Sequence, residues 1–293
     1  MIDIHFIVNP IAGQGRNNFS ESFLQDYFEA DKYNITIKSS IYKGHALVLS
    51  KESIFQKATI IVACGGDGTI NEVASTLVGT SIQLGVIPIG SGNGLASTLN
   101  IPRNIHKALL LIKKNNKIRI DVGQINQRYF FSNTGFSFSA SVIKNYEEQN
   151  KRTLSSYVTA TLKSLFYYSK KNKLNIRIND KTDVTDPFLV FVSNSNTLGY
   201  DMSLTPKASL QDGLLDIVIV PKISVLKMLY FGLCLLLKKP NLLKEAICYQ
   251  SDSLTLYRTQ GAFYLSQIDG ESSQINEETL LISIQRKALN VLV

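Results

Sequence analysis

The apolar residues of the first 100 positions fall into short runs that alternate with segments of helical spacing. The predicted strands are residues 3–8, 35–41, 59–63 and 84–88, and the predicted helices are 19–28, one opening at 44–46, 70–78 and a short one after 94. Strand, loop and helix repeated four times predict an α/β domain with a parallel sheet and right-handed crossovers.

The pattern changes near Asp121. Short β-rich runs then dominate, at 128–132, 174–178, 188–192, 214–220, 252–257, 262–268 and 279–284. Turn signals separate these runs, and only 154–169 and 225–237 have helical character. The sequence therefore predicts a second, β-rich domain of sandwich or barrel type, with 1–121 as the first domain and 122–286 as the second.

Three glycine-rich loops follow predicted strands, at residues 9–16, 64–69 and 89–94. In open α/β sheets, ligands bind at the carboxyl ends of the strands, and a helix N-terminus offers amides to an anion. Asp67 inside such a loop would repel a phosphate unless a cation lay between them, so we expect a metal-assisted phosphate site. The signatures of P-loop enzymes and of dinucleotide dehydrogenases are absent from the sequence.

The composition of the chain limits which classes of binding partner are expected. The formal net charge is +8 and the pI is about 9.2, which fits an anionic partner, but no long Lys/Arg block supports nucleic acid. The three cysteines lack metal spacing, and no signal-peptide pattern precedes the first strand, so a reducing cytosol is expected. The apolar run 228–237 is too short to span a bilayer, which leaves a core helix or a helix lying on a membrane surface.

These loops carry a resemblance to a known family. Residues 9–16 (NPIAGQGR), 65–73 (GGDGTINEV) and 88–96 (PIGSGNGLA) resemble the three signatures of the diacylglycerol kinase catalytic domain. Residues 206–216 (PKASLQDGLLD) and 269–271 (DGE) resemble later motifs of the same family, and the chain is most similar to its soluble bacterial members that group with sphingosine kinases.

The resemblance implies a nucleotide-binding domain like that of phosphofructokinases and NAD kinases, to which residues 287–293 return, and a β-rich domain for the lipid substrate. It implies ATP and Mg²⁺ as cofactors. The nucleotide contacts that we expect are Asn9, Gly13, Arg16, Gly44, His45, Gly65, Gly66, Asp67, Gly68, Thr69, Glu72, Ser91 and Gly92.

The resemblance also implies roles for the acidic residues. Glu271 is the expected general base, with Asp269 beside it, although Asp-Gly here also matches an ordinary hairpin turn. Metal ligands are expected at Asp212, Ser209 and Leu214, with Asp67 and Asp121 as further candidates. Asp67 could also cap the helix that follows it, by accepting from amides near Ile70, and both roles can hold at once.

One departure affects the substrate. Asn93 is followed by Gly94, where diacylglycerol-type bacterial members carry an aspartate, so sphingoid bases and other lipid alcohols stay open as substrates. We expect an ATP-dependent lipid kinase, cytoplasmic and peripheral to a membrane, with a homodimer left open. The alternatives are a kinase of a soluble nucleotide such as NAD, and a non-catalytic nucleotide- or lipid-binding regulator.

Overall fold

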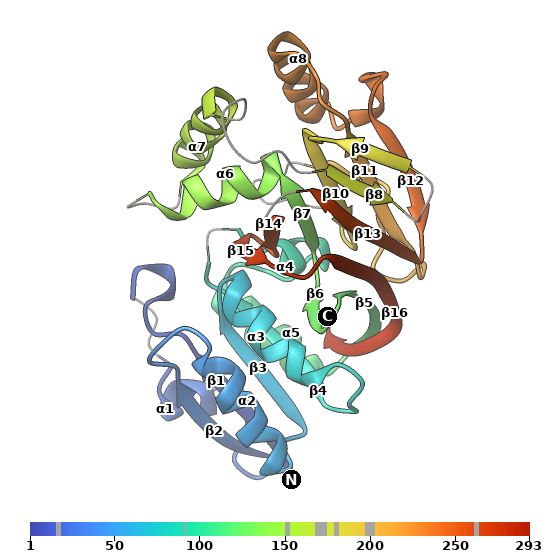
Figure 1. The fold of residues 1–293 in the computed structure, drawn as a ribbon. Coiled ribbons are helices and arrows are strands. Elements are labelled where there is room, and N and C mark those ends of the chain that lie inside the picture. The colour runs from blue at the N-terminus through green and yellow to red at the C-terminus, as the bar shows by residue number, and fades with distance from the viewer. Residues whose placement is uncertain are drawn as a thin grey trace. The chain divides into compact units, whose positions relative to one another are not determined.

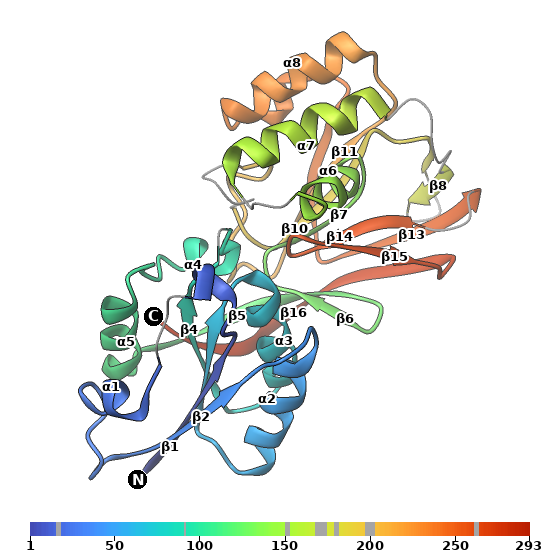
Figure 2. The same cartoon turned by 90° about the vertical axis from the view of Figure 1, so that its left-hand side faces the viewer.

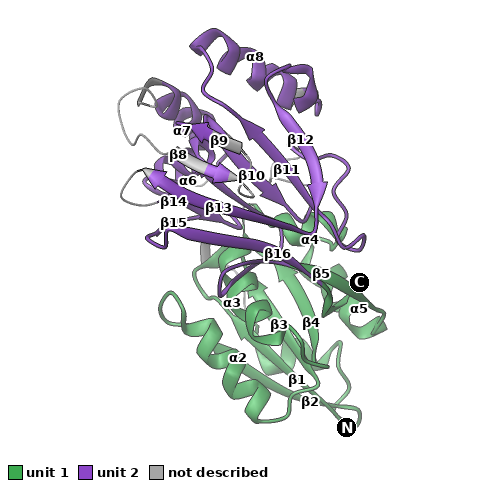
Figure 3. Cartoon of the chain, turned by 45° about the vertical axis from the view of Figure 1, so that its right-hand side comes forward, with its two compact units in different colours: residues 1–122, 286–293 green, residues 123–285 purple. Residues whose placement is uncertain are grey.

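The computed structural model describes residues 1–15, 19–90, 92–149, 153–167, 175–178, 182–196, 203–260 and 264–293. The chain divides into two compact units, residues 1–122 with 286–293 and residues 123–285 (Figure 3). Each unit is described by itself below. No helix in these described ranges is both long enough and apolar enough to cross a bilayer.

Unit 1 is an α/β domain with parallel strands, as the sequence predicts (Figure 1). Its sheet is ordered β2-β1-β3-β4 and is extended by the last residues of β16, with all neighbours parallel. The strands are β1 (Ile2–Val8), β2 (Tyr33–Ser39), β3 (Ile60–Gly65), β4 (Gln83–Pro88) and β16 (Thr279–Leu292). The helices are α1 (Glu21–Gln25), α2 (His45–Phe55), α3 (Asp67–Leu77), α4 (Gly94–Thr98) and α5 (Ile105–Lys114), with a 3-10 turn, η1, at Ala12–Gly15.

Helices cover both faces of this sheet, with α1 and α5 on one side of the strands and α2 and α3 on the other (Figure 2). In β1, Ile4 and Phe6 join a core with Leu109 of α5, and every second residue of the strand faces that way. Because both faces are covered, the central strand β3 is a continuous apolar run that is buried throughout.

Unit 2 contains a six-stranded antiparallel sheet, ordered β12-β11-β10-β7-β14-β15. Its strands are β7 (Asn133–Ser137), β10 (Leu189–Ser193), β11 (Leu215–Val220), β12 (Ile247–Ser251), β14 (Tyr264–Ile268) and β15 (Glu271–Ile275). A second antiparallel set pairs β13 (Ser253–Gln260) with the first half of β16 and with β8 (Asn175–Ile178), which pairs with β9 (Thr182–Thr185). Strand β5 (Lys117–Ile125), which starts in unit 1, pairs with β6 (Arg128–Phe130) through residues 123–125.

The two antiparallel sets share one core, which makes unit 2 sandwich-like. Val190 and Ile217 of the six-stranded sheet lie in the same buried cluster as Leu254 and Ile282 of the second set. The opposite face of the six-stranded sheet carries helices: Phe191 and Val218 pack in a separate cluster with residues of α8 (Val225–Leu236). Strands β10 and β11 therefore bury both faces.

Two further helices of unit 2 are α6 (Phe138–Glu147) and α7 (Leu154–Tyr167). The sequence analysis predicts α7 and α8 but misses α6. Its segment, FSASVIKNYE, contains serines and β-branched residues, which have weak helix propensity. A short 3-10 turn, η3, occupies Pro240–Leu242.

Candidate active site

Three loops of unit 1 begin where parallel strands end. Asn9 follows β1, Gly66 follows β3, and Ile89 follows β4. The loops are joined by backbone hydrogen bonds, because Asn9 N–H donates to the Cys64 carbonyl and Ile89 N–H donates to the Gly65 carbonyl, each at 2.9 Å. The glycine-rich loops therefore meet at one edge of the sheet, as the sequence predicts.

Two of the glycines allow loops to touch. A Cβ built on Gly90 would lie 2.5 Å from the Cα of Gly66 and 2.9 Å from Oδ1 of Asn93. Real Cβ atoms do not approach backbone so closely, so the β3 and β4 loops pack at a distance that only glycine permits. Asn93 itself is buried, with a φ of 57°, and its Nδ2 donates to the Gly90 carbonyl at 2.6 Å.

Asp67 clamps these loops from the first turn of α3. Its Oδ2 accepts from Asn93 N–H and its Oδ1 from Gly94 N–H, both at 2.7 Å. A Cβ on Gly92 would lie 2.6 Å from Oδ2, so this glycine leaves room for the carboxylate. Asp67 thus binds the start of α4 from the first turn of α3.

Asn9, Gly65 and Thr69 form a second contact among the predicted nucleotide residues. Asn9 Nδ2 donates to Thr69 Oγ1 at 3.2 Å, and Thr69 is buried in α3. A Cβ on Gly65 would lie 2.5 Å from both Cβ and Oγ1 of Thr69. The β1 loop is therefore tied to the helix that starts at the β3 loop, and Gly68 lies within that helix.

Glu72 braces α2. Its Oε1 accepts from Gly44 N–H at 2.8 Å and its Oε2 from Ala46 N–H at 3.1 Å. Gly44, at φ 90°, takes a left-handed conformation that suits glycine. His45 stacks on Tyr42 with ring centroids 4.5 Å apart, and its Nδ1 accepts from the Ile41 amide. Glu72 thus positions the α2 start.

The other predicted unit 1 positions are placed as follows. Gly13 lies in η1 at φ 62°. Asp121 is buried and its Oδ1 accepts from Lys287 N–H at 2.6 Å, so it fastens the returning strand β16 to β5. Arg16 and Ser91 lie outside the described residues.

In unit 2, Asp269 and Gly270 form the two-residue turn between β14 and β15. Ile268 pairs with Glu271, and the two turn residues have φ values of 48° and 81°, the signs that a type I′ turn requires. The local backbone is thus the hairpin turn that Asp-Gly indicates. Of the predicted catalytic pair, Asp269 is the first residue of that turn and Glu271 directly follows it.

The Asp269 carboxylate is held by three amides from a distant segment. Its Oδ2 accepts from Phe131 N–H at 2.9 Å, and its Oδ1 accepts from Ser132 and Asn133 N–H at 2.8 and 3.1 Å. The side chain is only 7% exposed. Charge-assisted bonds of this kind are strong, so Asp269 fixes the hairpin to the start of β7.

A buried polar network surrounds this turn. Gln267 donates through Nε2 to Asn133 Oδ1 at 2.8 Å and accepts through Oε1 from Gly270 N–H at 2.9 Å. Asn194 Nδ2 donates to the Phe131 carbonyl at 3.2 Å. Asn133, Asn194 and Gln267 belong to this network but are not among the site residues that the sequence predicts. Their signal is a polar residue at the end of an apolar β run.

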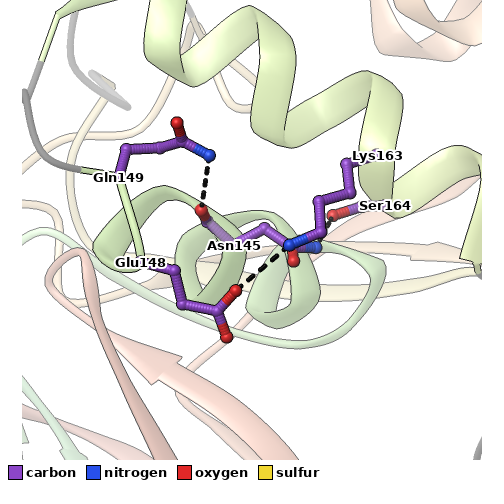
Figure 4. A network of polar contacts seen from close by, with 5 residues as sticks. All are labelled: Asn145, Glu148, Gln149, Lys163 and Ser164. Carbon is purple, nitrogen blue, oxygen red and sulfur yellow. Dashed lines mark hydrogen bonds and ion pairs between the residues drawn. The ribbon is translucent and has the colours of Figure 1, made fainter.

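Glu271 begins β15, and its neighbour Ser272 is anchored to α6. Both the amide and Oγ of Ser272 donate to the carboxylate of Glu147, the amide at 3.0 Å. Helix α6 is itself tied to α7, because Asn145 donates to Ser164 at 2.8 Å and Lys163 pairs with Glu148 at 3.1 Å (Figure 4). Two helices thus support the strand that presents Glu271.

The predicted metal loop contains a local turn. Asp212 Oδ1 accepts from Leu214 N–H at 3.0 Å, and Ser209 Oγ accepts from Gln211 N–H at 3.2 Å. Asp216 lies nearby and accepts from Gln250 at 3.1 Å. Burial, and then the charge of Asp212, raises the pKa of Asp216. Among the described residues, no group of three or more His, Cys, Asp or Glu side chains could hold a metal ion.

The chain matches two family models, one in the α/β unit with the converging glycine loops and one in the antiparallel, sandwich-like unit. The diacylglycerol kinase catalytic domain matches residues 3–125, and the YegS C-terminal NAD kinase beta sandwich-like domain matches residues 133–236. Diacylglycerol kinase of Bacillus subtilis (strain 168) is 30% identical over 227 residues, which cover 75% of this chain and 74% of the relative. The chain therefore belongs to the diacylglycerol kinase catalytic domain family.

A second relative and a solved structure are consistent with this family. A protein named "Probable lipid kinase YegS-like" from Pectobacterium atrosepticum is 30% identical over 207 residues, or 67% of this chain and 68% of the relative. The crystal structure of a diacylglycerol kinase from Bacillus anthracis str. Sterne superposes with a TM-score of 0.70 over 99% of this chain and 96% of that one. At 22% identity, that likeness supports the fold alone.

Proposed function

We propose that this protein is an ATP-dependent lipid kinase that transfers the γ-phosphate to the hydroxyl of a lipid alcohol. Membership of the family carries the proposal, together with the names of its relatives, diacylglycerol kinase and lipid kinase. The acceptor can be diacylglycerol, a sphingoid base or a related lipid, because Gly94 stands where diacylglycerol-type members carry an aspartate.

Unit 1 takes the nucleotide in this proposal. Phosphoryl transfer depends mainly on positioning and on neutralising charge. The three loops at the sheet edge would surround the phosphates, and the Gly66–Gly90 contact and the Asp67 clamp hold two of them in one shape. Rigid loops lose little conformational entropy when the nucleotide binds.

Glu271 takes the general-base role. It would accept the proton of the lipid hydroxyl while that oxygen attacks the γ-phosphorus and ADP leaves. Asp269 then acts on position and not on the proton, because its carboxylate accepts three backbone amides. Glu147, through Ser272, holds the strand that carries Glu271.

Mg²⁺ is proposed with the nucleotide, and it would neutralise phosphate charge when bound. Asp212 fits a hard cation: one oxygen binds the Leu214 amide, and the other has no hydrogen-bond partner in the described ranges. The carbonyls of Ser209 and Leu214 would complete that site. If Asp212→Ala leaves the Mg²⁺ dependence of the activity unchanged, the assignment is wrong.

The proposal places the protein in the cytoplasm, at the surface of a membrane that supplies the lipid, without a nucleic-acid partner. A soluble nucleotide such as NAD is the second candidate acceptor. The specific observation that favours it is the Gly65-Gly66-Asp67-Gly68 motif, which NAD kinases share, together with the NAD kinase-like description of the second family model. Loss of catalysis, leaving a nucleotide- or lipid-binding regulator, is the third.

One assay separates these functions. Terminally labelled ATP is incubated with diacylglycerol, a sphingoid base or NAD, and with the wild-type protein or Glu271→Ala. Label in a lipid that depends on Glu271 supports the proposal. Label in NAD alone establishes the soluble-nucleotide kinase, and no transfer to any acceptor favours the regulator.

A further inference from the structure

Helix α8 has two apolar faces, of which only one is buried. Met228, Phe231 and Cys234 pack against Phe191 and other residues of the six-stranded sheet. These three side chains are 7%, 2% and 1% exposed. The inner face of α8 is therefore buried against the core of unit 2.

The opposite face is a row of exposed apolar side chains, which we call the α8 outer face. Its members form two neighbouring rows at helical spacing, residues 225, 229 and 233 and residues 226, 230, 233 and 237, and so lie on one side of the helix. They are Val225, Leu226, Leu229, Tyr230, Leu233 and Leu237, with exposed fractions of 60%, 79%, 50%, 46%, 59% and 63%. Single exposed leucines are ordinary, but a contiguous set of six indicates a binding surface.

The charges around this face are basic. Residues 222–247 contain five lysines and one glutamate, a formal charge of 5 − 1 = +4. Lys222 pairs with Asp186, and Lys227 pairs with Glu245. The remaining lysines beyond the helix end are exposed, at 238, 239 and 244.

We propose that the α8 outer face docks on the surface of an anionic bilayer. The proposal rests on the proposed lipid kinase function, since that enzyme must reach a substrate held in a membrane. An apolar helix face bordered by lysines can bury its leucines at the headgroup boundary while the lysines contact anionic lipid.

The charge argues against a second copy of the chain as the occupant. Two α8 outer faces in contact would bring two +4 segments together, and like charges in an interface disfavour association. A bilayer of anionic lipid supplies the opposite charge. Its apolar boundary also accepts six side chains without a matching pocket.

The first test compares two exposed helical leucines. Leu229→Glu places a charge in the α8 outer face, and Leu110→Glu in α5 is the matched control, because the two leucines are 50% and 49% exposed. Full-length proteins are sedimented with vesicles of phosphatidylserine and phosphatidylcholine, whose headgroups are anionic and neutral and carry no free hydroxyl that could accept phosphate. We expect Leu229→Glu to bind at least about tenfold more weakly and Leu110→Glu to bind like the wild type.

The second test adds a side chain without removing one. A Cβ built on Gly232 of α8 meets nothing within 4 Å, so substitutions there do not disturb packing. Gly232→Glu should weaken vesicle binding several-fold, whereas Gly232→Lys and Gly232→Ala should preserve it. Thermal unfolding midpoints of the three variants should match or exceed that of the wild type, because glycine is a poor helix former.

The outcomes are separable from those of the kinase assay. Vesicle binding that depends on α8, without phosphate transfer to any lipid, would overturn the proposed function and keep this inference. No binding of the wild type to anionic vesicles, or equal binding of Leu229→Glu, would overturn the inference. So would a change in oligomeric state caused by Leu229→Glu, which would assign the face to a second copy.

Discussion

Asp67 in unit 1 and Asp269 in unit 2 look alike in sequence, since each precedes a glycine in an acidic turn that the family resemblance links to chemistry. In the structure both carboxylates accept backbone amides from a distant segment. They differ in burial and in number of donors. Asp269 is 7% exposed and accepts from three amides of the described residues, whereas Asp67 is half-buried and accepts from two of them.

The same kind of contact, a carboxylate that accepts backbone amides, therefore serves two purposes. At Asp269 the carboxylate satisfies amides that water cannot reach, so its loss should cost stability first. At Asp67 the carboxylate shapes the loops where we propose that phosphate binds, so its loss should also affect ligand affinity.

The largest effect is expected for Asp269→Ala. Removing the carboxylate leaves three buried amides without their hydrogen-bond acceptor. We therefore expect a loss of about 4 kcal/mol in the free energy of unfolding. Chemical denaturation followed by fluorescence or circular dichroism measures it. The matched control is Asp212→Ala, also in an Asp-Gly turn but exposed and bonded to one amide, which should cost less than about 1 kcal/mol. Equal losses of unfolding free energy in the two variants would contradict the stabilising role that we assign to the Asp269 carboxylate.

The next effect tests the contact between loops. Gly90→Ala puts a Cβ 2.5 Å from the Cα of Gly66, whereas Gly66→Ala puts one 3.3 Å from the Cα of Gly90. We expect Gly90→Ala to destabilise the protein by about 2 to 3 kcal/mol and Gly66→Ala by clearly less. Denaturant midpoints of both variants would decide, and the reverse order would show that the loops pack differently.

A smaller effect is expected for Asp67→Asn. The amide has one acceptor oxygen, so one of the two N–H groups at Asn93 and Gly94 loses its partner. We expect a cost of about 1 to 2 kcal/mol in stability and roughly tenfold weaker ATP binding by calorimetry. If Asp67→Asn binds ATP as tightly as the wild type, the contacts of Asp67 with the start of α4 do not contribute to nucleotide binding.

The smallest effect concerns Asp216, to which Gln250 donates from its side chain and not from the backbone. Burial raises the pKa of Asp216, and Gln250 is its hydrogen-bond partner. A raised carboxyl pKa means that stability is lost as the pH rises from the ordinary value through the raised one. Asp216→Asn should therefore raise stability near pH 7 by about half a kcal/mol and have no effect near pH 3. Melting curves across that range test the sign, and a gain confined to low pH would contradict it.

The elements that alternate along the chain could be predicted because each depends on local pattern. Strand β10 shows this, since its continuous apolar run matches the two faces that it buries. Helix α6 could not be predicted, because tertiary packing overrides the weak helix propensity of its serines.

Site contacts were predictable only where they are local. The Asp269-Gly270 turn follows from its two residues, but its amide donors lie more than 130 positions away. The glycine loops could be expected at one sheet edge, yet the 2.5 Å constraint between Gly66 and Gly90 depends on how β3 and β4 are spaced. Pair contacts of this kind require the fold.

The central claim is that Glu271 performs the proton transfer while Asp269 holds the turn. It is tested most directly by single-turnover phosphate transfer from ATP to a lipid alcohol, measured beside the unfolding midpoint of each variant. We predict that Glu271→Gln lowers the rate by about 10² to 10⁴-fold with an unchanged midpoint, whereas Asp269→Asn lowers the midpoint. A Glu271→Gln protein that transfers phosphate at the wild-type rate would contradict the account.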